Sequence, residues 1–373
     1  MRIIAFYLPQ FHPIPENDAW WGKGFTEWTN VAKARPLFRG HHQPQVPADL
    51  GFYDLRLEEI RIAQADLARE YGIGGFCYYH YWFNGKMLLE RPFNEVLASG
   101  RPDFPFCLCW ANENWSRRWD GMEQDVLAQQ NYDEYDPIQH LEWLARAFRD
   151  ARYIKVSGKP LFLVYWADHV PRVADVLATW RREARRILQT DLYVCAVRSH
   201  KFGLTDAETV SAGFDALVNF HPHPKHFIRP DQARITRFIN TRINALCEGC
   251  GLDASRWFPI YSQHDYAKYV ANVCSSSHGE VKQFPCVFPS WDNSARKKRD
   301  ATIIQNVDAA LFAQWVRHSL KAVERYPEEE RIVFVNSWNE WAEGCHLEPD
   351  LRNGRRFLEA VRDALADSAR VRP

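Results

Sequence analysis

The sequence predicts a single (β/α)8 barrel, or TIM barrel, of the α/β class, with long loops at the carboxyl ends of its strands. Eight short apolar runs alternate with segments of helical periodicity, and this order is typical of a parallel sheet with right-handed crossovers. Polar and aromatic residues follow nearly every run, which is expected at the active-site face of a barrel. A length of 373 residues is ordinary for one such barrel.

Each predicted strand is rich in β-branched or aromatic residues and is bounded by turn residues. The strands are Ile3–Tyr7, Gly75–Tyr79, Phe106–Trp110, Leu161–Tyr165, Leu192–Val197, Ala216–Asn219, Cys286–Phe288 and Ile332–Val335. Helical periodicity runs through Leu55–Tyr71, Pro137–Ala151, Arg172–Leu188, Asn306–Tyr326 and Asn353–Ala366. Eight strands favour a closed barrel over an open sheet.

We expect one catalytic domain over residues 1–373, because no repeat, low-complexity tract or linker divides the chain. Two connections are long. Residues 20–49 are rich in Trp, Pro and His and are expected to fold over the pocket as a lid. Residues 221–285 form an insertion that should carry its own helices, over Ile235–Cys247 and His264–Cys274.

Charge and hydropathy exclude several classes of partner. Lys+Arg and Asp+Glu are equal at 47 each, so no overall field favours nucleic acid. The basic stretch at residues 296–299 is expected to be a solvated loop. No stretch reaches the roughly 20 apolar residues of a membrane span, and the apolar N-terminus is too short for a signal peptide. Nine scattered cysteines suit a reducing compartment, so we expect a cytoplasmic protein with no obligate protein partner.

Two carboxylates follow the eighth predicted strand directly, at Glu340 and Glu343, between Trp338 and Trp341. Close like charges and partial burial both favour keeping a proton on one of the two. An acid and a base at the same pH are what glycoside cleavage requires. The alternative is a helix N-terminus, where Glu is favoured by the helix dipole. The position after a strand favours the catalytic interpretation.

The remaining candidate residues are suited to binding sugars. Aromatic residues make up 14% of the chain, with 15 Trp, and an indole can stack on the C–H face of a sugar while amides and carboxylates hold its hydroxyls. Glu113 could be a third catalytic carboxylate, although a binding role is favoured. The expected substrate-binding residues are Tyr7, Gln10, His12, Tyr79, His80, Trp82, Trp110, Asn112, Glu113, Asn114, Trp115, His221, Trp291, Trp338, Asn339 and Glu348.

No metal or cofactor is expected. His221, His223 and His226 are favoured as structural or substrate-binding residues, since the intervening prolines restrict their adjustment. Cys247 and Cys250 have zinc-ligand spacing but no second pair. The chain contains no Gly-x-Gly-x-x-Gly after a strand, no P-loop and no Gly-x-Ser-x-Gly. It also lacks an Asp-x-Asp pair, the usual metal clamp for a nucleotide sugar.

Four segments, 6–12, 24–28, 109–115 and 339–344, resemble the WbsX-type proteins of bacterial O-antigen and surface-polysaccharide loci. That family is grouped as similar to glycoside hydrolase family 99, which contains retaining endo-α-mannosidases. The resemblance extends from residue 2 to about residue 360, and is narrower toward family 99 itself. It implies that Glu340 removes the proton of a sugar 2-hydroxyl, which attacks C1 to give a 1,2-anhydro sugar. It implies that Glu343 protonates the leaving oxygen and later activates water.

Three functions therefore stand as hypotheses. The first is a glycosidase that acts on mannose- or rhamnose-configured linkages of an oligosaccharide or polysaccharide from the bacterial surface. The second is a glycosyltransferase in the same biosynthesis, which the usual name of WbsX-type proteins favours. The third is a catalytically silent glycan-binding protein, which the presence of Glu340 and Glu343 disfavours.

Overall fold

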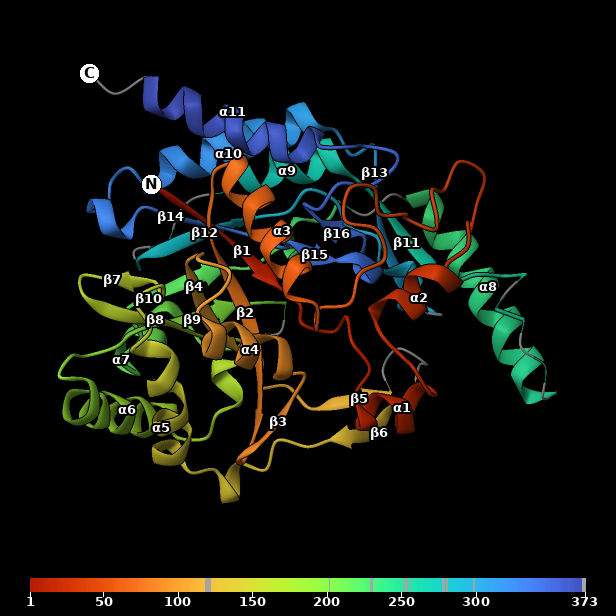
Figure 1. Cartoon of the computed structure of the whole chain (residues 1–373). Coiled ribbons are helices and arrows are strands. Elements are labelled where there is room, and N and C mark those ends of the chain that lie inside the picture. Colours follow the sequence, from red (N-terminus) through yellow and green to blue (C-terminus); the bar gives the residue numbers. More distant parts are fainter. Residues whose placement is uncertain are drawn as a thin grey trace.

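The structure, a computed structural model, is a closed barrel of eight parallel strands (Figure 1). It describes residues 1–370 except 118–121, 201, 229–230, 251, 253, 256, 277–278, 280 and 298. The barrel strands are β1 (Arg2–Tyr7), β2 (Ile73–Phe83), β4 (Phe106–Trp110), β8 (Lys159–Val164), β9 (Tyr193–Arg198), β10 (Ala216–Asn219), β12 (Gln283–Val287) and β14 (Ile332–Val335). Each pairs with the next along the chain, and β14 pairs with β1 to close the barrel. The predicted TIM barrel is confirmed.

Helices lie in the connections and cover the outside of the barrel (Figure 1). They are α3 (Glu58–Glu70), α4 (Arg91–Ser99), α5 (Pro137–Phe148), α6 (Val173–Leu188), α7 (Asp206–Ser211), α9 (Tyr266–Cys274), α10 (Ala309–Val323) and α11 (Arg356–Arg370). Helix α5 shows how the sequence sets a boundary. Asp136 accepts a hydrogen bond from the Ile138 amide over 2.8 Å, and Pro137 occupies the first turn, where its missing N–H costs nothing.

The second strand differs from its predicted range. Residues 80–82 were expected to be a loop after a strand that ended at Tyr79, but β2 continues to Phe83 and turns back through β3 (Lys86–Leu88). Aromatic side chains at successive positions favour an extended strand whose two faces are both covered, and here the barrel interior covers one face and helices cover the other. Helices α4 and α7 were not predicted.

Shorter helices and strands lie in the loops that connect the barrel strands and helices. They are α1 (Pro15–Trp21), α2 (Glu27–Lys33), β5 (Trp115–Arg117), β6 (Met122–Ala128), β7 (Lys155–Val156), β11 (Tyr261–Asp265), β13 (Ala301–Gln305), β15 (Asn339–Glu340) and β16 (Cys345–His346). Short 3-10 turns span Tyr132–Glu134, Ala167–His169, Pro224–His226, Asn293–Ala295, Glu328–Glu330 and Trp341–Glu343. Helix α2 lies within residues 20–49, and α1 ends at the start of this range. The connection that was expected to form a lid therefore contains regular structure.

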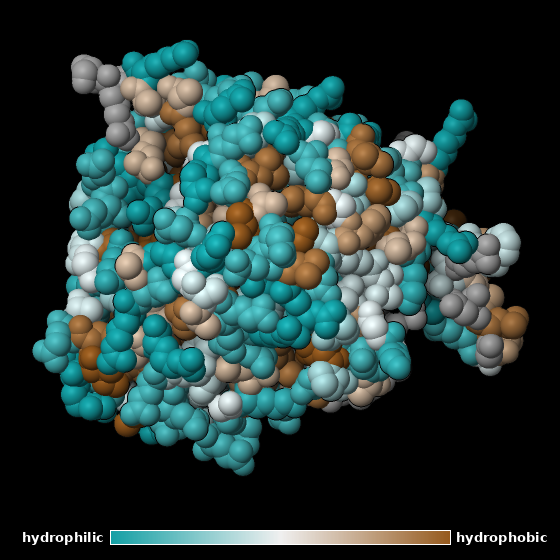
Figure 2. Space-filling model, viewed as in Figure 1, coloured by the Kyte–Doolittle hydropathy of each residue, from teal (hydrophilic) through white to brown (hydrophobic). Residues whose placement is uncertain are grey.

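Helix α8 (Asp231–Gly249) projects from the barrel (Figure 1). It extends the predicted helix over Ile235–Cys247 at both ends. Its exposed side chains include Ile235, Phe238 and Leu246, and Figure 2 shows hydrophobic surface over the projection. In the part of the chain that the structure describes, no helix combines the length and the apolar character needed to cross a bilayer.

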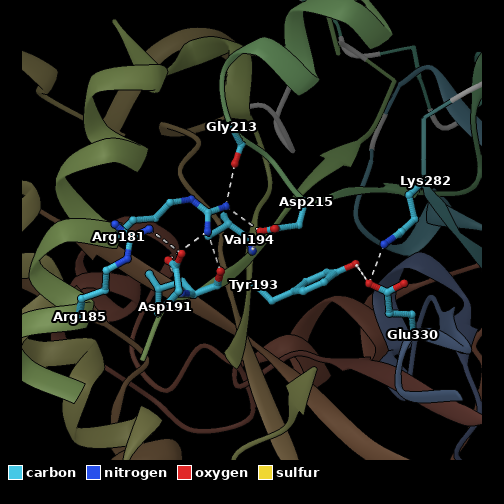
Figure 3. Close-up of polar contacts among 10 residues, drawn as sticks. Arg181, Arg185, Asp191, Tyr193, Val194, Gly213, Asp215, Lys282 and Glu330 are labelled. Carbon is cyan, nitrogen blue, oxygen red and sulfur yellow. Dashed lines mark hydrogen bonds and ion pairs between the residues drawn. The ribbon is translucent and has the colours of Figure 1, made fainter. Parts of the chain in front are cut away.

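A network of charged residues closes the amino-terminal end of the barrel (Figure 3). Arg181 on α6 donates to Asp191, to Asp215 and to two backbone carbonyls, and so fixes the starts of β9 and β10. Nearby, Glu330 accepts from Tyr193 and from Lys282. In TIM barrels this end serves stability, and the functional site lies at the opposite end, where the carboxyl ends of the strands meet.

Candidate active site

One guanidinium holds three carboxylates together at the carboxyl end of the barrel. Arg296 Nη2 lies 2.7 Å from Glu27 Oε1 and 2.9 Å from Glu340 Oε2. Arg296 Nη1 lies 2.8 Å from Glu343 Oε1. Two of the three carboxylates are the residues predicted to be catalytic, and all three reach the same cation, so Glu340 and Glu343 face a common space.

The expectation that residues 296–299 form a solvated loop is wrong for Arg296. Its side chain is only 10% exposed, because the segment after β12 folds back over the barrel and the guanidinium is drawn to the carboxylates. Lys298 lies outside the described residues. Glu27 was not proposed as a site residue either. It begins α2 with no exposed surface, and its Oε1 also accepts from the Ala342 amide over 2.9 Å.

Burial governs the electrostatics of this cluster. Loss of water raises the pKa of Glu340 to about 8, with the charges of Glu343 and Glu27 acting in the same direction and Arg296 opposing them. Burial likewise raises the pKa of Glu27. Three carboxylates against one guanidinium leave an excess of negative charge in a poorly solvated place, and the cluster therefore retains a proton at neutral pH.

The backbone around Glu343 is held by Asp292, whose carboxylate is in turn held by two residues near the start of the chain. The Asp292 amide donates to the Glu343 carbonyl over 2.7 Å. In turn, Asp292 Oδ2 lies 2.7 Å from His41 Nε2 and 2.8 Å from Gln43 Nε2. Gly344 has φ +57°, and a Cβ there would lie 3.0 Å from the Asp292 amide nitrogen. Glycine is required at this position both by conformation and by space.

A cavity of about 340 Å³ opens beside the two catalytic candidates. Eight of its lining residues are Trp, Tyr or Phe, and polar side chains lie among them, as in sugar-binding sites. Two buried donors that line it, Gln10 Nε2 and Trp291 Nε1, have no hydrogen-bond partner among the described residues. A hydroxyl-rich ligand could accept from both. Eight of the predicted residues line this cavity: Gln10, Tyr79, Glu113, Asn114, Trp115, Trp291, Glu340 and Glu343.

Strand alternation explains why other predicted residues do not line the cavity. On β2, Tyr79 points inward, whereas His80 and Trp82 point outward to α5. His80 stacks on Trp143, and burial lowers its pKa to about 3. Trp110, the last residue of β4, also lies outside the cavity and donates to the Trp82 carbonyl over 3.2 Å, whereas Glu113 lines the cavity from the loop that follows this strand.

Asn112 and Asn339 act as ties between strand ends. The side chain of Asn112 accepts a hydrogen bond from the Trp166 backbone amide and donates one to the Trp166 carbonyl, each over 2.8 Å. Asn339 forms the equivalent pair with Leu8, at 2.8 and 3.0 Å. A carboxamide that satisfies both groups of one residue in this way holds the neighbouring chain in place. These two side chains position the site from outside the cavity.

Glu348 lies beside the segment that carries Glu340 and Glu343, outside the cavity. It accepts from Tyr53 over 2.8 Å, from Gln64 over 2.7 Å and from Trp341 over 2.6 Å. Burial raises its pKa to about 7. Tyr7 joins the same network by donating to Gln64 over 2.6 Å. Trp338 and His12 are also buried outside the cavity.

Sequence reasoning missed several residues of the cavity. Tyr81 and Tyr165 line it beside the predicted Tyr79, as do Trp21 and His200. Tyr81 could have been found by alternation from Tyr79, and Tyr165 by its place at the end of the fourth predicted strand. No sequence pattern predicted that Arg296 and Glu27 belong to the site, because the two residues are 269 positions apart and meet only in the folded chain.

His221 lies in a different cavity, and its Nδ1 is 2.7 Å from the Tyr269 hydroxyl. Cys247 and Cys250 are free thiols. Among the described residues, no three His, Cys, Asp or Glu side chains are placed to hold a metal ion.

Comparison with known proteins identifies relatives over almost the whole chain. Residues 3–361 match the family model described as Glycosyltransferase WbsX. The uncharacterized protein WxcX of Xanthomonas campestris pv. campestris is 39% identical over 364 residues in strain B100, and 40% identical in strain ATCC 33913. The alignments cover 97% of this chain but 49% of WxcX, so the chain spans about half the length of the curated relatives that it matches.

Solved structures share the fold. A GH99 endo-α-mannosidase from Bacteroides thetaiotaomicron, in complex with bis-tris-propane, aligns with a TM-score of 0.57 and 11% identity, over 100% of this chain and 98% of that one. A glycoside hydrolase-like protein aligns with a TM-score of 0.60 and 14% identity, over 97% and 93% of the two chains. At such identities the likeness shows the barrel fold alone.

Proposed function

The chain belongs to the WbsX family, and from this premise we propose that it is a glycosidase with Glu340 and Glu343 as its catalytic pair. The proposed substrate is a mannose- or rhamnose-configured linkage in a bacterial surface polysaccharide or its precursor. The observation that carries the proposal is the shared contact of both carboxylates with Arg296, at 2.9 and 2.8 Å, beside an aromatic-walled cavity.

The proposed reaction proceeds through the sugar's own 2-hydroxyl. Ionised Glu340 takes the proton of that hydroxyl as its oxygen attacks C1, and Glu343 protonates the leaving oxygen. Water then attacks C1 of the 1,2-anhydro sugar and gives its proton to Glu343, while Glu340 returns a proton to O2. Configuration at C1 is retained after two inversions. This route requires a 2-hydroxyl trans to the leaving group, as in α-mannosides and α-rhamnosides.

The ion-pair cluster around Arg296 supports the proposed roles of Glu340 and Glu343 in proton transfer. A carboxylate whose pKa is raised to about 8 is a stronger base, once ionised, than an ordinary one. Arg296 would stabilise that ionised form and hold both carboxylates in register. Gln10 and Trp291 would supply donors to the sugar hydroxyls, and Tyr79, Tyr81 and Tyr165 would wall the ring.

A matched pair of substrates tests the mechanism. The enzyme would be incubated with an aryl α-mannoside and with its 2-deoxy analogue, and the anomer first released would be followed by proton NMR. The proposal predicts release of the α-anomer from the mannoside and no turnover of the 2-deoxy sugar. Equal turnover of the two substrates would exclude the 2-hydroxyl as nucleophile.

A glycosyltransferase remains the second candidate, and the description of the family model favours it. Calorimetry with UDP- and GDP-sugars, in the presence and absence of Mn2+, separates the two functions. Tight binding of a sugar nucleotide, together with transfer to an acceptor glycan, would reverse their order.

We also propose that the protein acts in the cytoplasm. Six of its nine free cysteines are buried, including Cys77, Cys107 and Cys195, and a chain that keeps so many thiols unpaired suits a reducing compartment.

A further inference from the structure

A second cavity, of about 260 Å³, lies on the outer side of the barrel wall. Strands β10 and β12 form its inner side, and α9 and α10 contribute to the remainder through Val273 and Trp315. Phe220 lines both this cavity and the candidate active site. Neither Glu340 nor Glu343 lines it, so it is a separate space with its own chemistry.

Positive charge dominates the lining of this second cavity. Arg198, Lys225 and Arg325 carry the cations, and Asp206 is the one carboxylate among the described lining residues. Asp206 is already paired with Arg198. Within the described part of the chain, the Lys225 ammonium has no ion-pair partner. Burial lowers the pKa of His223 and of His226 to about 4, and both imidazoles are therefore neutral at pH 7.

A buried donor faces the same space. Gln283 is 5% exposed and lines the cavity. Its Oε1 accepts from Asn219 over 2.8 Å, but its Nε2 has no hydrogen-bond partner among the described residues. A buried donor without an acceptor is costly, and a ligand with acceptor oxygens would remove that cost. Arg325 Nη2 donates over 2.7 Å to the Tyr326 hydroxyl, which itself accepts from the backbone N–H of Gln283 over 3.0 Å, so Arg325 lies near the backbone of Gln283.

We propose that this cavity binds a phosphorylated, sugar-sized ligand, with the phosphate held by Lys225, Arg325 and Gln283. Lysine and arginine form strong charge-assisted hydrogen bonds to phosphate oxygens. The volume corresponds to roughly nine water molecules at about 30 Å³ each, more than a phosphate ion needs. Phe220, Val273 and Trp315 supply an apolar wall for the rest of the ligand. The assignment is independent of the proposed glycosidase activity.

Titration calorimetry of the whole chain with three probes tests the assignment: inorganic phosphate, mannose 1-phosphate and mannose. We expect mannose 1-phosphate to bind most tightly, phosphate more weakly, and mannose least. Lys225→Ala and Arg325→Ala should each weaken mannose 1-phosphate binding by about tenfold or more, since hydrogen bonds to charged groups contribute that much. Lys225→Arg keeps the charge and should retain most of the affinity.

Two controls locate the binding. Lys268→Ala removes an exposed lysine of α9 outside the cavity and should leave the affinity unchanged, as should Glu340→Gln. Both Lys225 and Arg325 are exposed enough for their substitution to leave the fold intact, which the melting temperature would verify. The assignment is overturned if mannose binds as tightly as mannose 1-phosphate, if no probe binds at about 1 mM, or if Glu340→Gln alone abolishes the binding.

Discussion

Arg296 Nη2 donates to Glu340 Oε2 over 2.9 Å, and this contact joins the segment after β12 to the residue that ends β15. The same guanidinium reaches Glu27 and Glu343. Ion pairing therefore gathers at one point of the barrel three carboxylates that would otherwise repel one another in a buried place.

Replacing Arg296 with Met should abolish activity and weaken the fold. Three carboxylates would be left without their cation, and breaking a buried ion pair typically costs about 3–5 kcal/mol. We expect kcat/KM to fall by at least about 100-fold and the urea midpoint to fall. Arg299→Met, in the same basic stretch, removes a partly exposed pair with Glu248 and serves as the control. An active, stable Arg296→Met enzyme would contradict this role.

The pH profile of kcat/KM should show a limb near pH 8. Burial raises the pKa of Glu340 to about 8, and a base works only in its ionised form. The rate should therefore rise about tenfold per pH unit below 8 and level off above it. Returning samples to pH 7 after each assay excludes irreversible inactivation. A rate that instead falls above pH 8 would make Glu340 the acid and reverse the two roles.

Glu348 should make stability depend on pH. Its pKa in the folded protein is raised to about 7 from an ordinary value of 4.5, so its contribution is fully present below pH 4.5 and is lost as pH rises to 7. Relative to Glu348→Gln, the wild type should lose on the order of 1–3 kcal/mol of unfolding free energy between pH 4.5 and 7.5. Urea denaturation at both pH values measures this.

Glu359→Gln, at an exposed position on α11, is the control for that comparison. A wild type and Glu348→Gln that change in parallel with pH would show that Glu348 is ionised in the folded protein throughout this range.

Two glycines separate backbone strain from steric clash. Gly344 and Gly354 have nearly the same φ, +57° and +56°, so alanine is strained by about 1 kcal/mol at either position. Only at Gly344 would the new Cβ meet neighbours, Gln45 Nε2 at 2.7 Å and the Asp292 backbone at 3.0 Å. We expect Gly354→Ala to lower the melting temperature slightly and Gly344→Ala to lower it several degrees further, with loss of activity. Equal effects of the two would indicate that the Asp292 contact does not position Glu343.

Most of the barrel was predictable from sequence because local pattern determines it. The eight apolar runs correspond to β1, β2, β4, β8, β9, β10, β12 and β14, with shifts of a few residues at their ends. The exception is β2, where His80 and Trp82 were taken for a polar loop. Their outward packing on α5 depends on tertiary contacts that a single strand does not reveal.

Candidate site residues could be predicted from the sequence only where they directly follow a predicted strand. Glu340 and Glu343 follow the eighth strand directly, and their neighbourhood in the structure is that of a barrel mouth. The alternation of side chains along the second strand, counted from Tyr79, would have added Tyr81 to the binding residues. Glu27 and Arg296 were beyond reach, since each owes its burial to partners far away in sequence.

The central claim is that Glu340 and Glu343 together cleave a glycosidic bond. The most direct measurement is sugar release from α-mannoside and α-rhamnoside oligosaccharides by wild type, Glu340→Gln and Glu343→Gln at equal concentration. We predict release by the wild type and a reduction of at least about 1,000-fold in either variant. Release by the variants at the wild-type rate would contradict the account.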